Sequence, residues 1–140
     1  MDEVVDQILA DIHTTSHGSG HADNDTNKLL VVLGYMFPGI LVDAINLIEA
    51  NKGRKYCCEE IPSHSVWYIG GCTVNLSCWT CNCPDFIRAL CASEVSSTKW
   101  RRVCCHLMAA RLLIEKYSFF PPSKEPLVLS INDFIRFLFD

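Results

Sequence analysis

Four residues in two short motifs supply a complete set of ligands for a metal ion. Cys81 and Cys83 form a CxC pair, and Cys104 and His106 form a CxH pair farther along the chain. Thiolates are soft ligands that suit zinc or Cu(I), and an added imidazole favours zinc. A tetrahedral shell of three thiolates and one imidazole leaves no coordination position for water. We therefore expect one zinc ion with a structural role in a protein that is not an enzyme.

Two further cysteines leave the ligand set open. Cys78 forms a CxxC pair with Cys81, and Cys105 lies between the two ligands of the CxH pair. Either is a possible alternative ligand, and a shell of four sulfurs is then the result. A nucleophilic cysteine paired with His106 is the corresponding enzyme hypothesis. No recognisable catalytic motif surrounds such a pair, so the metal-ligand interpretation is favoured.

The composition is typical of one globular domain in a reducing compartment. The 140 residues are 49% hydrophobic and 20% charged, and no apolar run is long enough to span a bilayer. The first residues are acidic and lack the pattern of a signal peptide. The nine cysteines are an odd number, and without an export signal they are better explained by metal binding than by disulfides.

The charge distribution leaves one candidate surface for nucleic acid. The net charge of −4 argues against binding through bulk charge, but residues 84–116 hold six basic residues against three acidic ones. Lys99, Trp100, Arg101 and Arg102 combine positive charge with an aromatic ring that could stack on a base. In the alternative interpretation the tryptophan packs near the zinc ion and the basic residues are a solvated rim.

The chain divides into a short N-terminal region and one main domain. Residues 1–27 are predicted to form an amphipathic helix followed by a flexible linker around Gly18-Ser19-Gly20. Residues 28–140 are predicted to form a single domain that contains the metal site. It begins with two packed helices between Leu29 and Ile48, which Pro38-Gly39 separates.

The middle of the chain changes from helical to strand-like patterns. Residues 55–58, 65–69 and 72–76 are short and rich in β-forming side chains, and Gly70-Gly71 is typical of a two-residue hairpin turn. A helix is expected to begin at the CxH pair. The predicted fold class is therefore α+β, with a small antiparallel sheet and several helices around the zinc site.

The C-terminal segment is predicted to be a helix that meets another chain. Ser130 and Asp133 resemble a capping box, and the turns that follow are apolar on nearly every side. A helix of that kind must be buried, either in its own core or against a partner. The candidate partner anchors are Phe134, Ile135, Leu138 and Phe139.

These motifs carry a resemblance to a known family. The CxC…CxH pattern resembles the SWIM zinc finger, and the short chain is similar to the small SWIM-containing subunits of Shu complexes. The resemblance covers roughly residues 28–139. It includes the segment from Cys78 to Pro84, the helix that follows His106, and the helix start at Ser130.

The resemblance implies a nuclear accessory factor for homologous recombination in DNA repair and meiosis. Such subunits form an obligate complex with a RecA-like recombinase paralogue through protein–protein interaction. Together the two promote assembly and stability of the recombinase filament on single-stranded DNA, which this subunit would contact only indirectly. Any nucleotide site would belong to the paralogue, and this chain has no GxxxxGK[ST] phosphate loop. The alternative is a SWIM module that binds DNA directly in a transposase-like or transcription-associated protein.

Overall fold

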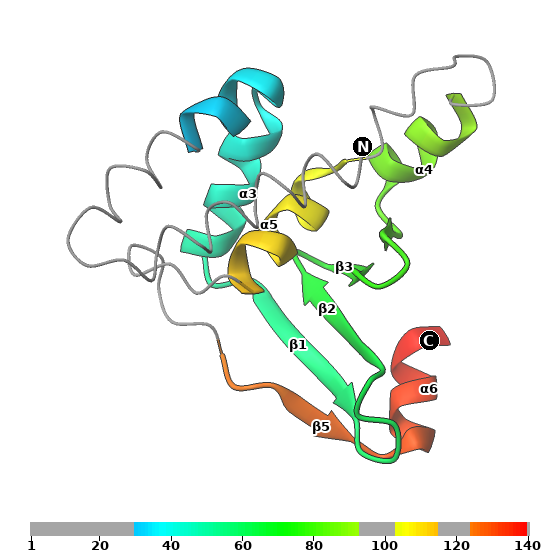
Figure 1. The fold of residues 1–140 in the computed structure, drawn as a ribbon. Helices are drawn as coiled ribbons and strands as arrows, with labels where there is room; N and C mark the ends of the chain where they lie inside the picture. The colour runs from blue at the N-terminus through cyan, green and yellow to red at the C-terminus, as the bar shows by residue number, and fades with distance from the viewer. Residues whose placement is uncertain (1–29, 93–102, 115–123, 140) are drawn as a thin grey trace.

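The computed structural model describes residues 30–92, 103–114 and 124–139 (Figure 1). The predicted N-terminal helix and linker over residues 1–27 lie outside these ranges, as do the candidate nucleic-acid contacts at 99–102. The described residues form helices and a five-stranded sheet of order β4-β3-β2-β1-β5, which confirms the α+β class. The strands are β1 (Gly53–Cys58), β2 (Ser65–Ile69), β3 (Cys72–Asn75), β4 (Thr80–Cys81) and β5 (Leu127–Leu129).

The sheet is mixed, whereas the sequence pattern predicted a purely antiparallel one. Strands β1 to β4 pair antiparallel in chain order, as expected for consecutive hairpins. Strand β5 instead pairs parallel with β1, with Tyr56 opposite Leu127 and Cys58 opposite Leu129. The chain reaches β5 only after α5, so a long crossover connection lies between the two paired strands. No local sequence pattern predicts such a pairing.

The predicted Gly70-Gly71 turn joins β2 to β3. Ile69 and Cys72 face one another across the hairpin, and the two glycines have φ angles of 56° and 86°. Positive φ at both central residues defines the turn type whose twist matches the flanking strands, and glycine adopts it without steric cost. The turn therefore sets the register of β2 and β3, and the chain continues from β3 to the first cysteine pair.

Helix α5 (Cys105–Ile114) lies against one face of the sheet, and helix α3 (Ile40–Glu49) packs on α5 (Figure 1). Residues 30–36 are also helical and precede α3. Helix α5 is the centre of the core, because its residues from Leu107 to Leu113 are buried on nearly every side apart from Arg111. A Cβ atom on Gly53 would lie 2.7 Å from Leu113 Cδ1, so β1 approaches α5 closely only because that position is glycine.

The opposite face is covered by α6 (Ile131–Phe139). Side chains alternate along a strand, so Tyr56 and Cys58 of β1 point away from the face that Gly53 presents to α5. Phe134 packs there with Cys58 and Val66 in a second, smaller core. Phe137 stacks on Tyr56, with ring centroids 4.3 Å apart.

The predicted helix start at Ser130 is confirmed. The backbone N–H of Asp133 donates to Ser130 Oγ at 3.3 Å, and the Ser130 hydroxyl donates to Asp133 Oδ2 at 2.9 Å. None of the helices in the described ranges has the length and apolar run that crossing a membrane requires.

Candidate metal centre

The structure brings the four predicted ligands together. The ligand atoms of Cys81, Cys83, Cys104 and His106 all lie within 4.8 Å of one another, although 20 residues separate the two pairs in the sequence. The three cysteine side chains are almost completely buried, and His106 is half-buried. Three sulfurs and one nitrogen at this spacing can enclose a single metal ion, so the cluster is a possible metal-binding centre.

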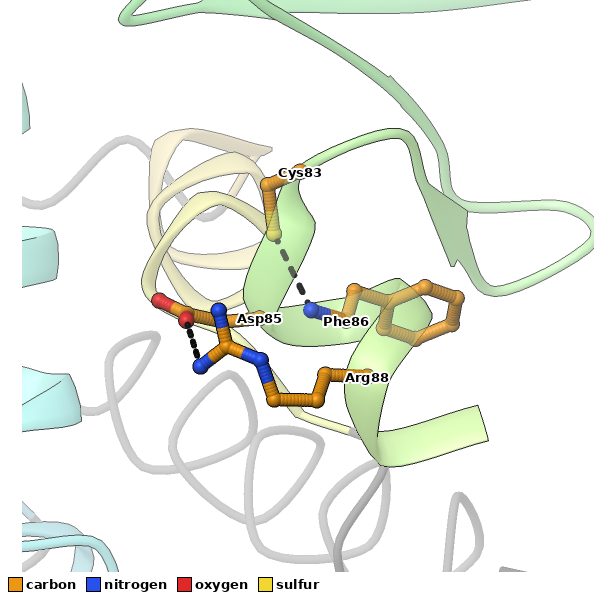
Figure 2. Close-up of polar contacts among 4 residues, drawn as sticks. All are labelled: Cys83, Asp85, Phe86 and Arg88. Atoms are coloured by element: carbon orange, nitrogen blue, oxygen red, sulfur yellow. Dashed lines mark hydrogen bonds and ion pairs between the residues drawn. The ribbon is translucent and has the colours of Figure 1, made fainter. Parts of the chain in front are cut away.

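Two of the sulfurs lie at the N-termini of helices. Cys83 precedes α4 (Pro84–Ala92), and its Sγ accepts a hydrogen bond from the backbone N–H of Phe86 at 3.3 Å (Figure 2). Cys104 precedes α5 in the same way, and its Sγ accepts from the N–H of Leu107 at 3.5 Å. Each cysteine therefore caps its helix, and at Cys104 the N–H of Leu107 and the helix dipole favour thiolate over thiol.

Asn82, the residue between the first two ligands, fixes the position of the CxC turn. Its side-chain Oδ1 accepts from the Thr73 N–H at 2.8 Å, and its own N–H donates to the Thr73 carbonyl at 3.2 Å. These bonds tie the turn to β3, and the Cys83 N–H then donates back to Cys81 Sγ at 3.4 Å. The CxC spacing did not predict this positioning role, although Asn in a tight turn is a common signal for hydrogen bonding between the side chain and the backbone.

The imidazole of His106 is held against the β2–β3 hairpin. A Cβ on Gly70 would lie 3.5 Å from His106 Nε2 and 2.8 Å from Leu47 Cδ2. Gly70 therefore serves two needs, because it adopts the positive φ of the turn and leaves space for the imidazole and Leu47. The hairpin glycine predicted from the turn pattern thus also shapes the metal centre.

The thiols and the imidazole of the metal-free centre share their protons. Hydrogen bonding from the Cys81 thiol, together with His106, lowers the pKa of Cys104 to about 4 despite its burial. The pKa of Cys81 is raised because its proton is bonded to Cys104 and because the side chain is desolvated. The bond to Cys104 raises the pKa of His106 to about 11, against the opposing effect of burial. The metal-free centre at neutral pH thus contains a Cys104 thiolate beside a His106 imidazolium.

Metal affinity is expected to rise with pH. The metal-free centre holds protons on Cys81 and His106 that the metal-bound centre does not, so raising the pH favours the bound form. Release of at least these two protons corresponds to at least about a 100-fold gain in affinity for each pH unit near neutrality. Competition with a chromophoric chelator at pH 6.5 and 7.5 measures this slope. An affinity that does not change with pH would contradict the proton assignment.

The two alternative ligands differ in their placement. Cys78 is exposed and lies outside the four-donor cluster, and its backbone N–H donates to Asn75 Oδ1 at 3.2 Å. Cys105 is half-buried, and its Sγ lies 3.7 Å from His106 Nδ1. Cys105 is therefore next to the centre, although the four-donor cluster forms without it.

The four predicted partner anchors do not share one environment. Phe134 is only 5% exposed and belongs to the core beneath α6, so the expectation that it faces a partner is wrong. Helix α6 turns this residue inward because Cys58 and Val66 offer an apolar surface there. Ile135, Leu138 and Phe139 remain on the outside, with 47%, 36% and 82% of their surfaces exposed.

No protein-family model matches the chain, and neither a curated protein nor a solved structure is similar to it. The metal centre is therefore supported by its own geometry. Three features support it: the clustering of four donors, the capping of two helices by ligand cysteines, and the hydrogen bonds from backbone N–H groups to three sulfurs.

Proposed function

We propose that the protein is a non-enzymatic, zinc-binding adaptor of the SWIM type. The observation that carries this proposal is the convergence of Cys81, Cys83, Cys104 and His106 at the junction of the sheet with α4 and α5. Three thiolates and one imidazole fill the tetrahedral shell of zinc, which supports a structural ion rather than a reactive one. In this role the metal ion holds together a sheet and two helices that present a surface to another protein.

The proposed partner surface is the outer side of α6. Ile131, Ile135 and Leu138 recur at helical spacing on this side, all at least 36% exposed, and Phe139 extends the stripe. An apolar helix stripe of this kind fits a groove on a partner protein. We propose that the partner is a RecA-like recombinase paralogue in a complex similar to Shu. The adaptor would then act in the nucleus, by promoting recombinase filaments on single-stranded DNA during homologous recombination.

Co-expression with such a paralogue tests this proposal. Replacing Ile135 and Leu138 together by serine should abolish co-purification of the paralogue, because both side chains lose apolar surface that the interface would bury. The metal content and thermal unfolding of the chain should stay unchanged, since both residues are exposed. Val42→Ser is the matched control, because Val42 is 59% exposed on α3. Normal complex formation by the α6 variant, or its loss in the control instead, would reject this surface.

A further inference from the structure

A fifth donor lies beside the four-donor cluster. Cys105 Sγ is 3.7 Å from His106 Nδ1, while the Nε2 edge of the same imidazole lies against Gly70. Cys105 therefore approaches the imidazole from the side that the hairpin leaves free. The start of α5 thus presents three consecutive metal-binding side chains, Cys104, Cys105 and His106, where the CxH motif requires only two.

Cys105 and His106 also share access to solvent. Both line an open groove of about 430 Å³ between α3 and the start of α5, whose wall includes Asp43 and Lys52. By contrast, Cys81, Cys83 and Cys104 are buried in the core. The groove leaves open space beside Cys105 and His106, whereas the core encloses the three buried sulfurs.

The separation of the Cys105 sulfur from the imidazole is small enough to compare with the displacement of a side-chain rotamer change. Rotation about the Cα–Cβ bond between staggered wells displaces Sγ by about 3 Å. Because Sγ starts 3.7 Å from His106 Nδ1, this movement is comparable to the separation of the two donors.

We propose that Cys105 is a reserve ligand that replaces His106 when the centre binds a thiophilic ion such as Cd²⁺. In the exchange Cys105 would supply a sulfur ligand in place of the His106 nitrogen, and the thiol proton would pass to the freed imidazole. No oxidant is needed. The shell then has four thiolates, which soft metal ions prefer over three thiolates and an imidazole. This inference concerns metal selection and goes beyond the adaptor role.

Cadmium binding by the unmodified full-length chain gives the first test. The Cd²⁺ form should show thiolate-to-metal charge-transfer absorption from four sulfurs, and Cys105→Ser should lose about a quarter of it. With Co²⁺, which accepts imidazole readily, the same substitution should leave the visible spectrum unchanged. Equal Cd²⁺ absorption in the two proteins overturns the proposal, and so does a wild-type chain that binds neither ion.

Removal of His106 gives the second test. His106→Ala should still bind one Co²⁺, with stronger charge-transfer absorption per ion than the wild type because a fourth thiolate replaces the imidazole. His106→Ala/Cys105→Ser should bind at least about 100-fold more weakly. His106→Ala/Cys78→Ser is the matched control and should behave like the single variant, because Cys78 is exposed and outside the cluster. The proposal is overturned if His106→Ala binds Co²⁺ as weakly as His106→Ala/Cys105→Ser does. It is also overturned if His106→Ala/Cys78→Ser binds Co²⁺ more weakly than His106→Ala does. Neither experiment measures co-purification of a partner. The proposed adaptor role and the proposed reserve ligand can therefore be rejected separately.

Discussion

Cys104→Ser is expected to abolish metal binding and to lower the unfolding temperature of the protein strongly. The substitution removes a ligand, the cap of α5 and the acceptor of the Leu107 N–H at one position. Metal binding contributes on the order of 10 kcal/mol to small structural zinc domains, which is comparable to the whole stability of an ordinary domain. Circular dichroism during thermal unfolding, with metal content measured on the same sample, checks this prediction.

Cys78→Ser is the matched control for that variant. The chemical change is the same, but Cys78 is exposed and lies outside the cluster. Its effect on the free energy of unfolding should stay within about 0.5 kcal/mol. Loss of the metal ion from the Cys78 variant, or a Cys104 variant that keeps its metal and its unfolding temperature, would show that the ligand assignment is wrong.

Leu112→Ala is expected to lower the free energy of unfolding by about 2–5 kcal/mol, because it leaves a cavity at a fully buried position. Leu112 lies on α5, which packs against α3 and against β2, β3 and β4. The neighbouring Ile114 is 42% exposed on the same helix, so Ile114→Ala should cost less than about 1 kcal/mol. Urea unfolding of the two metal-loaded variants compares them directly. Equal losses would mean that α5 is not the centre of the core.

Features that depend on local sequence could be predicted before the structure. Three kinds of feature involve residues only a few positions apart: the CxC and CxH pairs, the Gly70-Gly71 turn and the Ser130 cap. For such residues, local backbone geometry alone limits the conformations that the chain can adopt. Helix α4 begins at Pro84, just after Cys83, because proline is favoured at the first position of a helix. The sequence therefore predicted the two ligand pairs, the strands that precede the first pair and the helix that begins at the second.

Features that depend on distant contacts could not be predicted. The parallel pairing of β5 with β1 joins residues about 70 positions apart, and no periodicity in Leu127–Leu129 reveals its direction. The inward turn of Phe134 depends on the apolar surface that Cys58 and Val66 form together. The closeness of Cys105 to His106 depends on side-chain rotamers at the start of α5, which spacing alone does not determine.

The late position of β5 has a consequence for synthesis of the protein. Until residues 127–129 leave the ribosome, β1 is an edge strand with unpaired backbone groups on one side. The apolar side chains of Tyr56, Cys58 and Val66 also lack their cover at that stage, because α6 follows β5 in the chain. A nascent chain that already holds its metal ion thus still exposes a surface prone to aggregation. Chains that terminate just before Leu127 should accumulate as insoluble protein even when the metal centre is complete.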